Sequence, residues 1–264
     1  MTARLFLGQD MAAPLTVPLA DGLACVFTER RPGRESDNQD GAALIAGDAN
    51  SAVIAVADGL GGLPSGNLAA ALALQRLADS VAGQSGAEQR EAVLTGIEAA
   101  NAAVLANGQG GGTTIAVVSI DNDTVRAYHA GDSMIMVCGQ RGRLKYQSVQ
   151  HSPVGYAEAS GMLDEDAAMF HAERHLVSNM VGMAGMRVEV GPLVKLARYD
   201  TVVVGSDGLF DNLFVNEVIE LVRAGPLVKA AERLLTTCRE RMQLVDGDRP
   251  HKPDDLAFIL FRRR

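Results

Sequence analysis

Three apolar runs in this chain are each followed at once, or after one residue, by an aspartate. We expect each run to be a strand buried on both faces. The runs are residues 52–57, 125–130 and 201–205, and the aspartates are Asp58, Asp132 and Asp207. Carboxylates at the ends of buried strands are costly to leave unpaired, so several that converge on one place indicate a metal cluster.

Two further segments add aspartates of the same kind. Asp254 and Asp255 stand just before the last apolar run, 256–261, and Asp40 closes a polar stretch just before the apolar residues 42–45. Magnesium and manganese prefer oxygen ligands, which carboxylates supply. The sequence contains no cysteine–histidine cluster that would favour a softer metal.

The order of these motifs resembles the signatures of the type-2C metal-dependent serine/threonine protein phosphatases (PPM family), in their compact bacterial form. Each motif alone is weak, because Asp-Gly is a common turn, but six in the expected order are specific. The resemblance covers nearly the whole chain, from about residue 25 to about residue 261. The matching segments are residues 34–40, 58–62, 112–114, 131–133, 206–211 and 254–255.

Hydrophobic periodicity predicts an α+β fold. Apolar residues at helical spacing predict three helices, over residues 70–81, 93–104 and 227–238. Short connections in the middle of the chain predict a meander of antiparallel strands at residues 114–120, 124–130, 134–138 and from 144. The resemblance implies the specific form, a four-layer α/β/β/α sandwich of two stacked antiparallel sheets flanked by helices. We expect a single catalytic domain over residues 1–264, with a flap subregion at about 151–191.

The resemblance also implies a metal-ligand set. Asp58 would bridge two ions, the carbonyl of Gly59 would bind one of them, and Asp132 would share a third, weakly held ion with Asp207. The remaining carboxylate ligands would be Asp40, Asp207 and Asp254. The ions would be Mn²⁺ or Mg²⁺, two of them tightly bound. The alternative reading of each aspartate is a turn residue.

A guanidinium is expected to hold the phosphate oxygens with two aligned donors. Arg34 is the candidate, and the competing interpretation is a solvated basic loop. Arg34 stands four residues before Asn38, where the bacterial motif usually has three, so Arg31 is the second candidate. Asp255 matches a position usually held by asparagine and is expected to form local hydrogen bonds, and Asp211 is expected to cap a helix that follows it.

Two residues depart from the family pattern without touching a ligand position. Met134 replaces the arginine that commonly follows Gly-Asp-Ser. Leu60 occupies the position where eukaryotic members carry a histidine proposed as the leaving-group acid, so a metal-bound water is expected to supply that proton. The pair His171 and His175 fits neither HExxH nor HxxEH, so it does not indicate a zinc site.

Five methionines in the flap could form an adaptable contact surface or fill its core: 162, 169, 180, 183 and 186.

Composition restricts the class of protein further. The net charge of -8 argues against nucleic acid as the main partner. No apolar stretch approaches the roughly 20 residues of a membrane span, and the first ten residues do not resemble a signal peptide, so a cytoplasmic protein is expected. The three cysteines are expected to be reduced and packed. Neither a dinucleotide fingerprint nor a GxxxxGK[ST] loop is present.

These observations predict an enzyme that hydrolyses phosphoserine and phosphothreonine in bacterial proteins through a metal-bridging water, opposing a serine/threonine kinase. Two alternatives remain open. One is a non-catalytic relative that binds a phosphorylated partner, and the other is a phosphoesterase for small molecules. A pure binder has no need for four candidate metal aspartates, so the sequence favours the enzyme.

Overall fold

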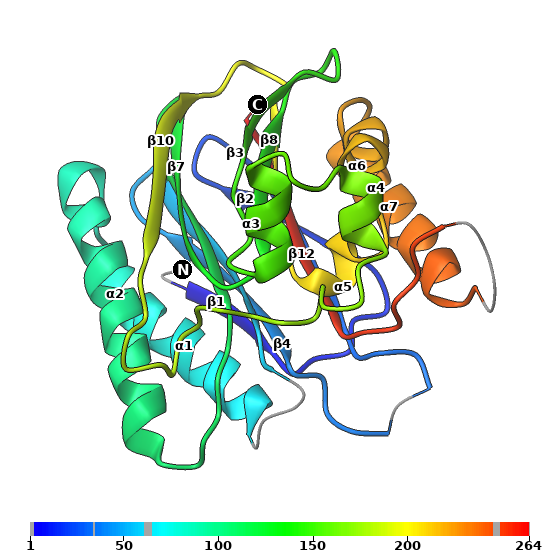
Figure 1. Ribbon diagram of the computed structural model, residues 1–264. Helices are drawn as coiled ribbons and strands as arrows, with labels where there is room; N and C mark the ends of the chain where they lie inside the picture. Colours follow the sequence, from blue (N-terminus) through cyan, green and yellow to red (C-terminus); the bar gives the residue numbers. More distant parts are fainter. Residues whose placement is uncertain (1–2, 34, 61–64, 245–248, 264) are drawn as a thin grey trace.

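Two six-stranded antiparallel sheets form the centre of the computed structural model, which describes residues 3–33, 35–60, 65–244 and 249–263 (Figure 1). The first sheet has the order β1 (Ala3–Leu7), β4 (Asp40–Ala46), β5 (Ser51–Asp58), β6 (Ile115–Asp121), β7 (Thr124–Ala130) and β10 (Glu189–Lys195). The second has the order β2 (Leu15–Leu19), β3 (Gly22–Glu29), β12 (Leu256–Arg263), β11 (Thr201–Gly205), β8 (Met134–Cys138) and β9 (Leu144–Gln147).

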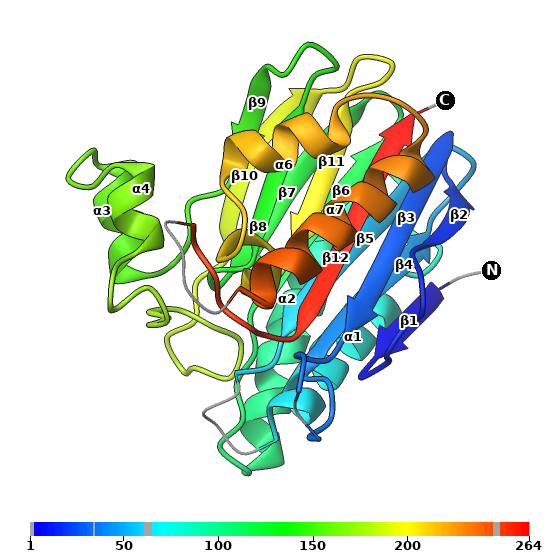
Figure 2. The ribbon, with the colours of Figure 1, turned by 90° about the vertical axis from the view of Figure 1, so that its right-hand side faces the viewer.

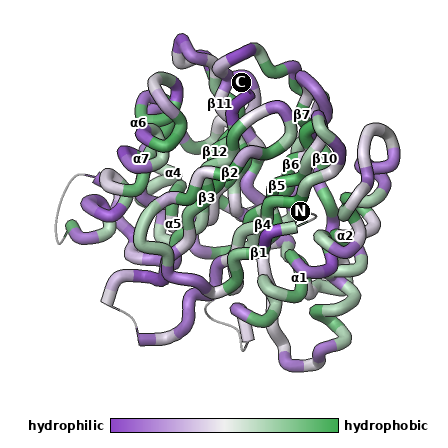
Figure 3. The backbone as a smooth tube through the Cα atoms, turned by 180° about the vertical axis from the view of Figure 1, so that it is seen from behind, coloured by the Kyte–Doolittle hydropathy of each residue, from purple (hydrophilic) through white to green (hydrophobic). Residues whose placement is uncertain are grey.

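The central strands are apolar on both faces because each sheet is covered twice. In β12, Ala257, Ile259 and Phe261 pack between the sheets, while Phe258 and Leu260 pack outward against helices. Successive side chains of a strand point to opposite faces, so one continuous apolar run supplies both cores. Figure 3 shows hydrophobic residues concentrated along the strands.

Helices complete the four layers that the sequence predicted. Helices α1 (Gly66–Val81) and α2 (Gly86–Asn107) pack on the outer face of the first sheet, and α5 (Asp207–Phe210), α6 (Val215–Val222) and α7 (Leu227–Met242) cover the second. The predicted helical faces are the buried ones. The α/β/β/α sandwich is therefore confirmed. The three cysteines are free and buried, as expected.

The predicted meander is wrong at one connection. Strands β6 and β7 pair, as do β8 and β9, but β7 and β8 belong to different sheets. The chain crosses between the sheets at Gly131, whose φ of 117° suits glycine and where a Cβ would lie 2.5 Å from Cβ of Thr114. Tight spacing alone cannot distinguish a hairpin from such a crossing. The crossing carries Asp132 to the end of the sandwich.

Residues 151–188 connect β9 to β10, and part of this segment, such as the buried Val181, packs against the core beneath α1 and α2. They include α3 (Pro153–Ala159) and α4 (Glu165–Met169), which project to one side in Figure 2. The expected flap subregion falls on this segment. Within the described residues, no helix has the length and apolarity needed to cross a lipid bilayer.

Candidate metal centre

Antiparallel pairing collects the predicted aspartates at one end of the sandwich. Asp40 begins β4 and Asp58 ends β5, and the two are direct partners in the register. Asp207 follows the end of β11, and Asp254 precedes the start of its antiparallel neighbour β12. Asp132 arrives from the crossing between the sheets. The start of one strand lies beside the end of the next, so residues far apart in the sequence meet here.

An open cleft of about 740 Å³ lies at this end of the sandwich. Five of the six predicted metal-site residues line it: Asp58, Gly59, Asp132, Asp207 and Asp254. The flap contributes His175, Leu176, Val177 and Met180 to the same lining, and Arg31, Lys252 and Asp255 also face it. Arg34, the predicted phosphate ligand, lies outside the described residues.

Asp40, the sixth predicted ligand, is buried at the cluster. Its side chain has 2% exposure, and neither carboxylate oxygen has a hydrogen-bond partner among the described residues. Burial raises the pKa of Asp40 well above its ordinary value. The hydroxyl of Ser206, which donates to the Ala257 carbonyl (3.4 Å), lowers this pKa in part, and Asp255, Asp207 and Asp254 raise it further. An unpartnered buried carboxylate costs free energy that a cation would offset.

The Gly-Thr-Thr segment fixes the backbone of Asp58. The Asp58 amide donates to Oγ1 of Thr114 (3.1 Å), and its carbonyl accepts from the Thr114 amide and from Oγ1 of Thr113 (2.9 Å each). The hydroxyl of Thr114 also contacts that of Ser133 (2.6 Å). Next to Asp58, a Cβ on Gly59 would lie 2.3 Å from the carbonyl oxygen of Gly66. The sequence identified residues 112–114 as a motif but gave them no role.

Mutual repulsion shapes the electrostatics of the cluster. Burial raises the pKa of Asp58 well above its ordinary value, and Asp40, Asp207 and Asp132 raise it further. Burial and then Asp207 raise the pKa of Asp132 to about 8, and one oxygen of Asp132 has no partner among the described residues. Burial and Asp207 raise that of Asp254 to about 6. This donor set consists of oxygens that repel one another, which fits a hard divalent cation.

One basic side chain, Lys252, enters the cluster, and sequence reasoning missed it. Its ammonium donates to Oδ2 of Asp207 and of Asp211 (2.8 Å) and lies 3.2 Å from Oδ2 of Asp254. Burial raises the pKa of Asp207, but Lys252 outweighs this and the net pKa is lowered. The only sequence signal was a lysine two residues before Asp254.

The expectation that Asp211 caps a helix is wrong. Helix α6 begins at Val215, and its free amides are satisfied by glutamates. The Phe214 amide donates to Glu217 (3.1 Å) and the Val215 amide donates to Glu165 (2.8 Å). Asp211 lies at the end of α5 instead and pairs with Lys252.

Asp255 forms the local hydrogen bonds that were expected. Its two carboxylate oxygens accept from the backbone amides of Arg31 (2.7 Å) and Gln39 (2.8 Å). One buried carboxylate therefore holds both ends of the loop that contains the candidate phosphate-binding arginines. An asparagine has only one side-chain oxygen acceptor and could not make the same two bonds.

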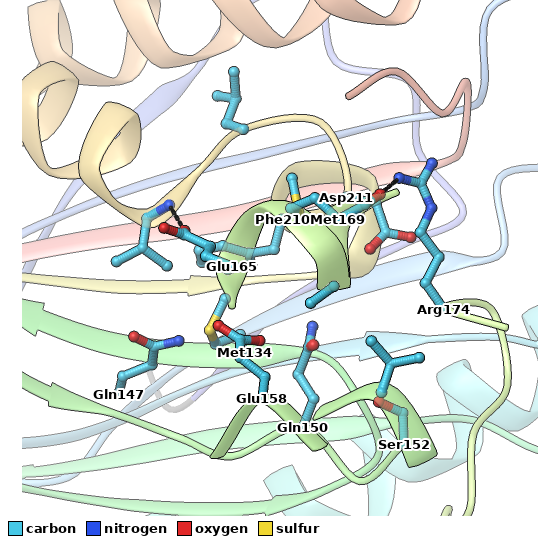
Figure 4. Close-up of a pocket in the computed structure, with 14 residues that line it drawn as sticks. Met134, Gln147, Gln150, Ser152, Glu158, Glu165, Met169, Arg174, Phe210 and Asp211 are labelled. Carbon is cyan, nitrogen blue, oxygen red and sulfur yellow. Dashed lines mark hydrogen bonds between the residues drawn. The ribbon is translucent and has the colours of Figure 1, made fainter. Parts of the chain in front are cut away.

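A small pocket of about 40 Å³ beneath the flap contains Met134 (Figure 4). Met134 is 5% exposed and packs in the core under α6 and α7. Arg174 donates to the Met169 carbonyl, and Glu165 holds the flap to α6 through Val215. The side chain at position 134 thus contributes to packing.

His129, His151 and Glu189 form a second cluster, with potential ligand atoms within 4.8 Å of one another. The hydrogen bonds argue against a metal there. Nδ1 of His151 accepts from Asn179 (2.8 Å), so we assign its proton to Nε2, which donates to Glu189 (3.2 Å). The two imidazoles stack with centroids 4.4 Å apart and planes 20° apart, so their in-plane lone pairs do not converge on one point.

Comparison with known proteins agrees with this geometry. Residues 30–246 match the family Protein phosphatase 2C. The chain belongs to this family.

Individual relatives support the same assignment. Protein phosphatase PhpP of Streptococcus pneumoniae is 28% identical over 219 residues, which cover 76% of this chain and 85% of PhpP. The solved serine/threonine phosphatase of S. agalactiae has a TM-score of 0.77 and 27% identity, covering 91% of this chain and 99% of that one. The catalytic domain of the phosphatase PstP, in complex with two manganese ions, has a TM-score of 0.73 and 21% identity over 90% of this chain and 96% of that one. The predicted family and enzyme class, a serine/threonine protein phosphatase, are confirmed.

Proposed function

We propose that this chain hydrolyses phosphoserine and phosphothreonine in proteins with two divalent cations held by the aspartate cluster. The ligands would be Asp40, Asp58, Asp207, Asp254 and the carbonyl of Gly59. The observation that carries the proposal is Asp40, because both oxygens of this buried carboxylate lack a hydrogen-bond partner among the described residues. A charged group in that environment is stable only beside a cation.

A pair of bound divalent ions supplies an activated water nucleophile and offsets the charge that develops on the phosphate. The protein's part is to hold the ligands still. The Asp58 backbone is fixed by Thr113 and Thr114 at 2.9 to 3.1 Å, so its carboxylate would be held in place to take an ion. Its register partner Asp40 would contribute from the start of β4, and Asp207 and Asp254 from the segments that flank β11 and β12.

The phosphate needs a positive donor on its non-reacting oxygens, and two arginines compete for this role. We keep Arg34 as the candidate from the motif order. Arg31 is supported by its place in the cleft lining and by its backbone bond to Asp255. Leu60 faces the cleft and cannot donate a proton, so solvent water is proposed to protonate the leaving alcohol.

Manganese is the proposed ion for assays, with magnesium as the alternative. Both accept an all-oxygen ligand set. The relative PstP was solved with two manganese ions.

A phosphorylated protein is the proposed partner, with a serine/threonine kinase as the opposing enzyme. The cleft is open, and the flap lines it with Leu176, Val177 and Met180, which offers apolar contacts to the residues around a phosphorylated side chain. A phosphoesterase for small molecules would not need such a lining.

Phosphate release from a phosphothreonine peptide and from para-nitrophenyl phosphate, each with manganese and with chelator, tests the proposal. Manganese-dependent hydrolysis of both is expected, with a higher kcat/KM for the peptide. Binding of the peptide without hydrolysis at saturating manganese would support a non-catalytic relative instead. Hydrolysis of the small ester alone would indicate a small-molecule phosphoesterase.

A further inference from the structure

Lys252 reaches the aspartate cluster from a fixed backbone. The buried amide side chain of Asn212 binds residue 252 at two points: Oδ1 accepts from the Lys252 amide (2.7 Å), and Nδ2 donates to the Lys252 carbonyl (2.8 Å). Asn212 is itself held, because Nδ2 donates to the Gly208 carbonyl (2.8 Å) and its own carbonyl accepts from Arg241 (2.9 Å). The position of this lysine is therefore built into the fold.

The ammonium of Lys252 occupies one side of the cluster. It contacts Asp207, Asp211 and Asp254, and the Lys252 side chain is 22% exposed. The carboxylate oxygens without a partner lie elsewhere, on Asp40 and Asp132. Lys252 thus supplies positive charge to Asp207, Asp211 and Asp254, while Asp40 and Asp132 keep carboxylate oxygens without a partner among the described residues.

We propose that Lys252 is a permanent cation of this centre, which takes the place of a third metal ion, so that the cleft binds two divalent ions. This inference rests on the proposed function. The resemblance implied a third, weakly held ion shared by Asp132 and Asp207. The ammonium of Lys252 already contacts Asp207. It brings a single positive charge to the place where a third ion would bring two.

Lys252 does not block the two expected ions. A carboxylate has about four lone-pair sites, and Lys252 uses one oxygen each of Asp207 and Asp254. Asp211, which is not an expected ligand, provides the third contact and holds the ammonium to the side of the cluster.

Calorimetric titration of the chelator-stripped full chain with manganese chloride tests the proposal through metal stoichiometry. We expect two ions for the unchanged protein, three for Lys252→Met and two for Lys252→Arg, which keeps the charge. Adding Asp132→Ala to Lys252→Met should return the count to two. Lys145→Met is the matched control, because Lys145 also pairs with a buried aspartate, Asp200, but away from the cleft. It should leave two ions.

Three ions in the unchanged protein, or two in a folded Lys252→Met, would overturn the role of Lys252. An unchanged count with a raised KM would show a substrate contact and would also overturn it. If Lys252→Met does not fold without metal, equilibrium dialysis of the unchanged protein at millimolar manganese still decides, since a third ion there refutes the proposal. Absence of any bound ion in the folded, unchanged protein would instead contradict the proposed function.

Discussion

Asp132→Asn is expected to stabilise the metal-free protein at pH 8 and to have little effect at pH 5. Asp132 is 5% exposed, and one of its oxygens has no partner within the described part of the chain. Burial, followed by repulsion from Asp207 and Asp211, raises its pKa from 3.8 to about 8. The folded protein therefore binds a proton at Asp132 more tightly than the unfolded chain does.

The sign and size follow from linkage. Between pH 3.8 and about 8 the folded state holds more protons than the unfolded state, so stability falls as the pH rises through this window. At about 1.4 kcal/mol per pKa unit, the raised pKa of Asp132 costs on the order of 5 kcal/mol at pH 8, where the folded state begins to ionise, and about 2 kcal/mol at pH 5, where the folded state keeps a proton that the unfolded chain releases. The introduced amide has two N–H donors where the protonated carboxyl has one O–H, and we allow about 1 to 3 kcal/mol for a buried donor that it leaves unsatisfied. The net gain should be about 2 to 4 kcal/mol at pH 8 and close to zero at pH 5.

Thermal unfolding with chelator at both pH values measures this difference. A domain of this size shifts its Tm by roughly 2 to 4 °C per kcal/mol, so we expect a rise of about 5 to 15 °C at pH 8. Asp79→Asn, at a surface site with a side chain 72% exposed, is the control and should change Tm little at either pH. An Asp132→Asn protein that is destabilised at pH 8, or stabilised equally at both pH values, would show that the pKa of Asp132 is not raised in the folded protein.

Three further predictions concern the cleft. Asp58→Asn should abolish turnover of para-nitrophenyl phosphate even at saturating manganese, because it weakens the link between both ions; wild-type kcat would show that the ligand assignment is wrong. Arg34→Ala or Arg31→Ala should lower kcat/KM, because it removes about 2 to 4 kcal/mol of transition-state stabilisation, and should not change the metal content. The variant with the larger loss of kcat/KM identifies the arginine that binds the phosphate. Small and equal losses of kcat/KM in both variants would exclude both arginines from this role. Asp255→Asn should lower Tm in a melting experiment by losing one amide contact worth about 1 to 3 kcal/mol; an unchanged Tm would contradict this.

The secondary structure and the cores could be predicted because burial leaves a periodic pattern. The run 256–261 predicted a strand covered on both faces, and β12 packs its alternate residues into two cores. The same pattern could not say that β7 and β8 lie in different sheets, because both are buried strands joined by a short loop. That assignment depends on the conformation of one glycine, Gly131.

The convergence of the aspartates was predictable because carboxylates at the ends of buried strands are costly to leave unpaired. The supporting contacts were not. Asp255 holds amides 216 and 224 residues away, and Lys252 meets Asp207 across 45 residues. Hydrogen bonds over such separations depend on the tertiary fold, and a single sequence contains no periodic signal for them. Asp211 was misread for the same reason, since its partner Lys252 is distant in sequence.

Metal dependence of the chemistry can be measured as turnover of para-nitrophenyl phosphate by the chelator-stripped protein during titration with manganese. Elemental analysis should confirm that the starting protein contains no metal. We expect no hydrolysis before manganese is added and recovery of full turnover as the aspartate cluster fills. Full turnover in protein shown to be free of metal would contradict a metal-dependent mechanism.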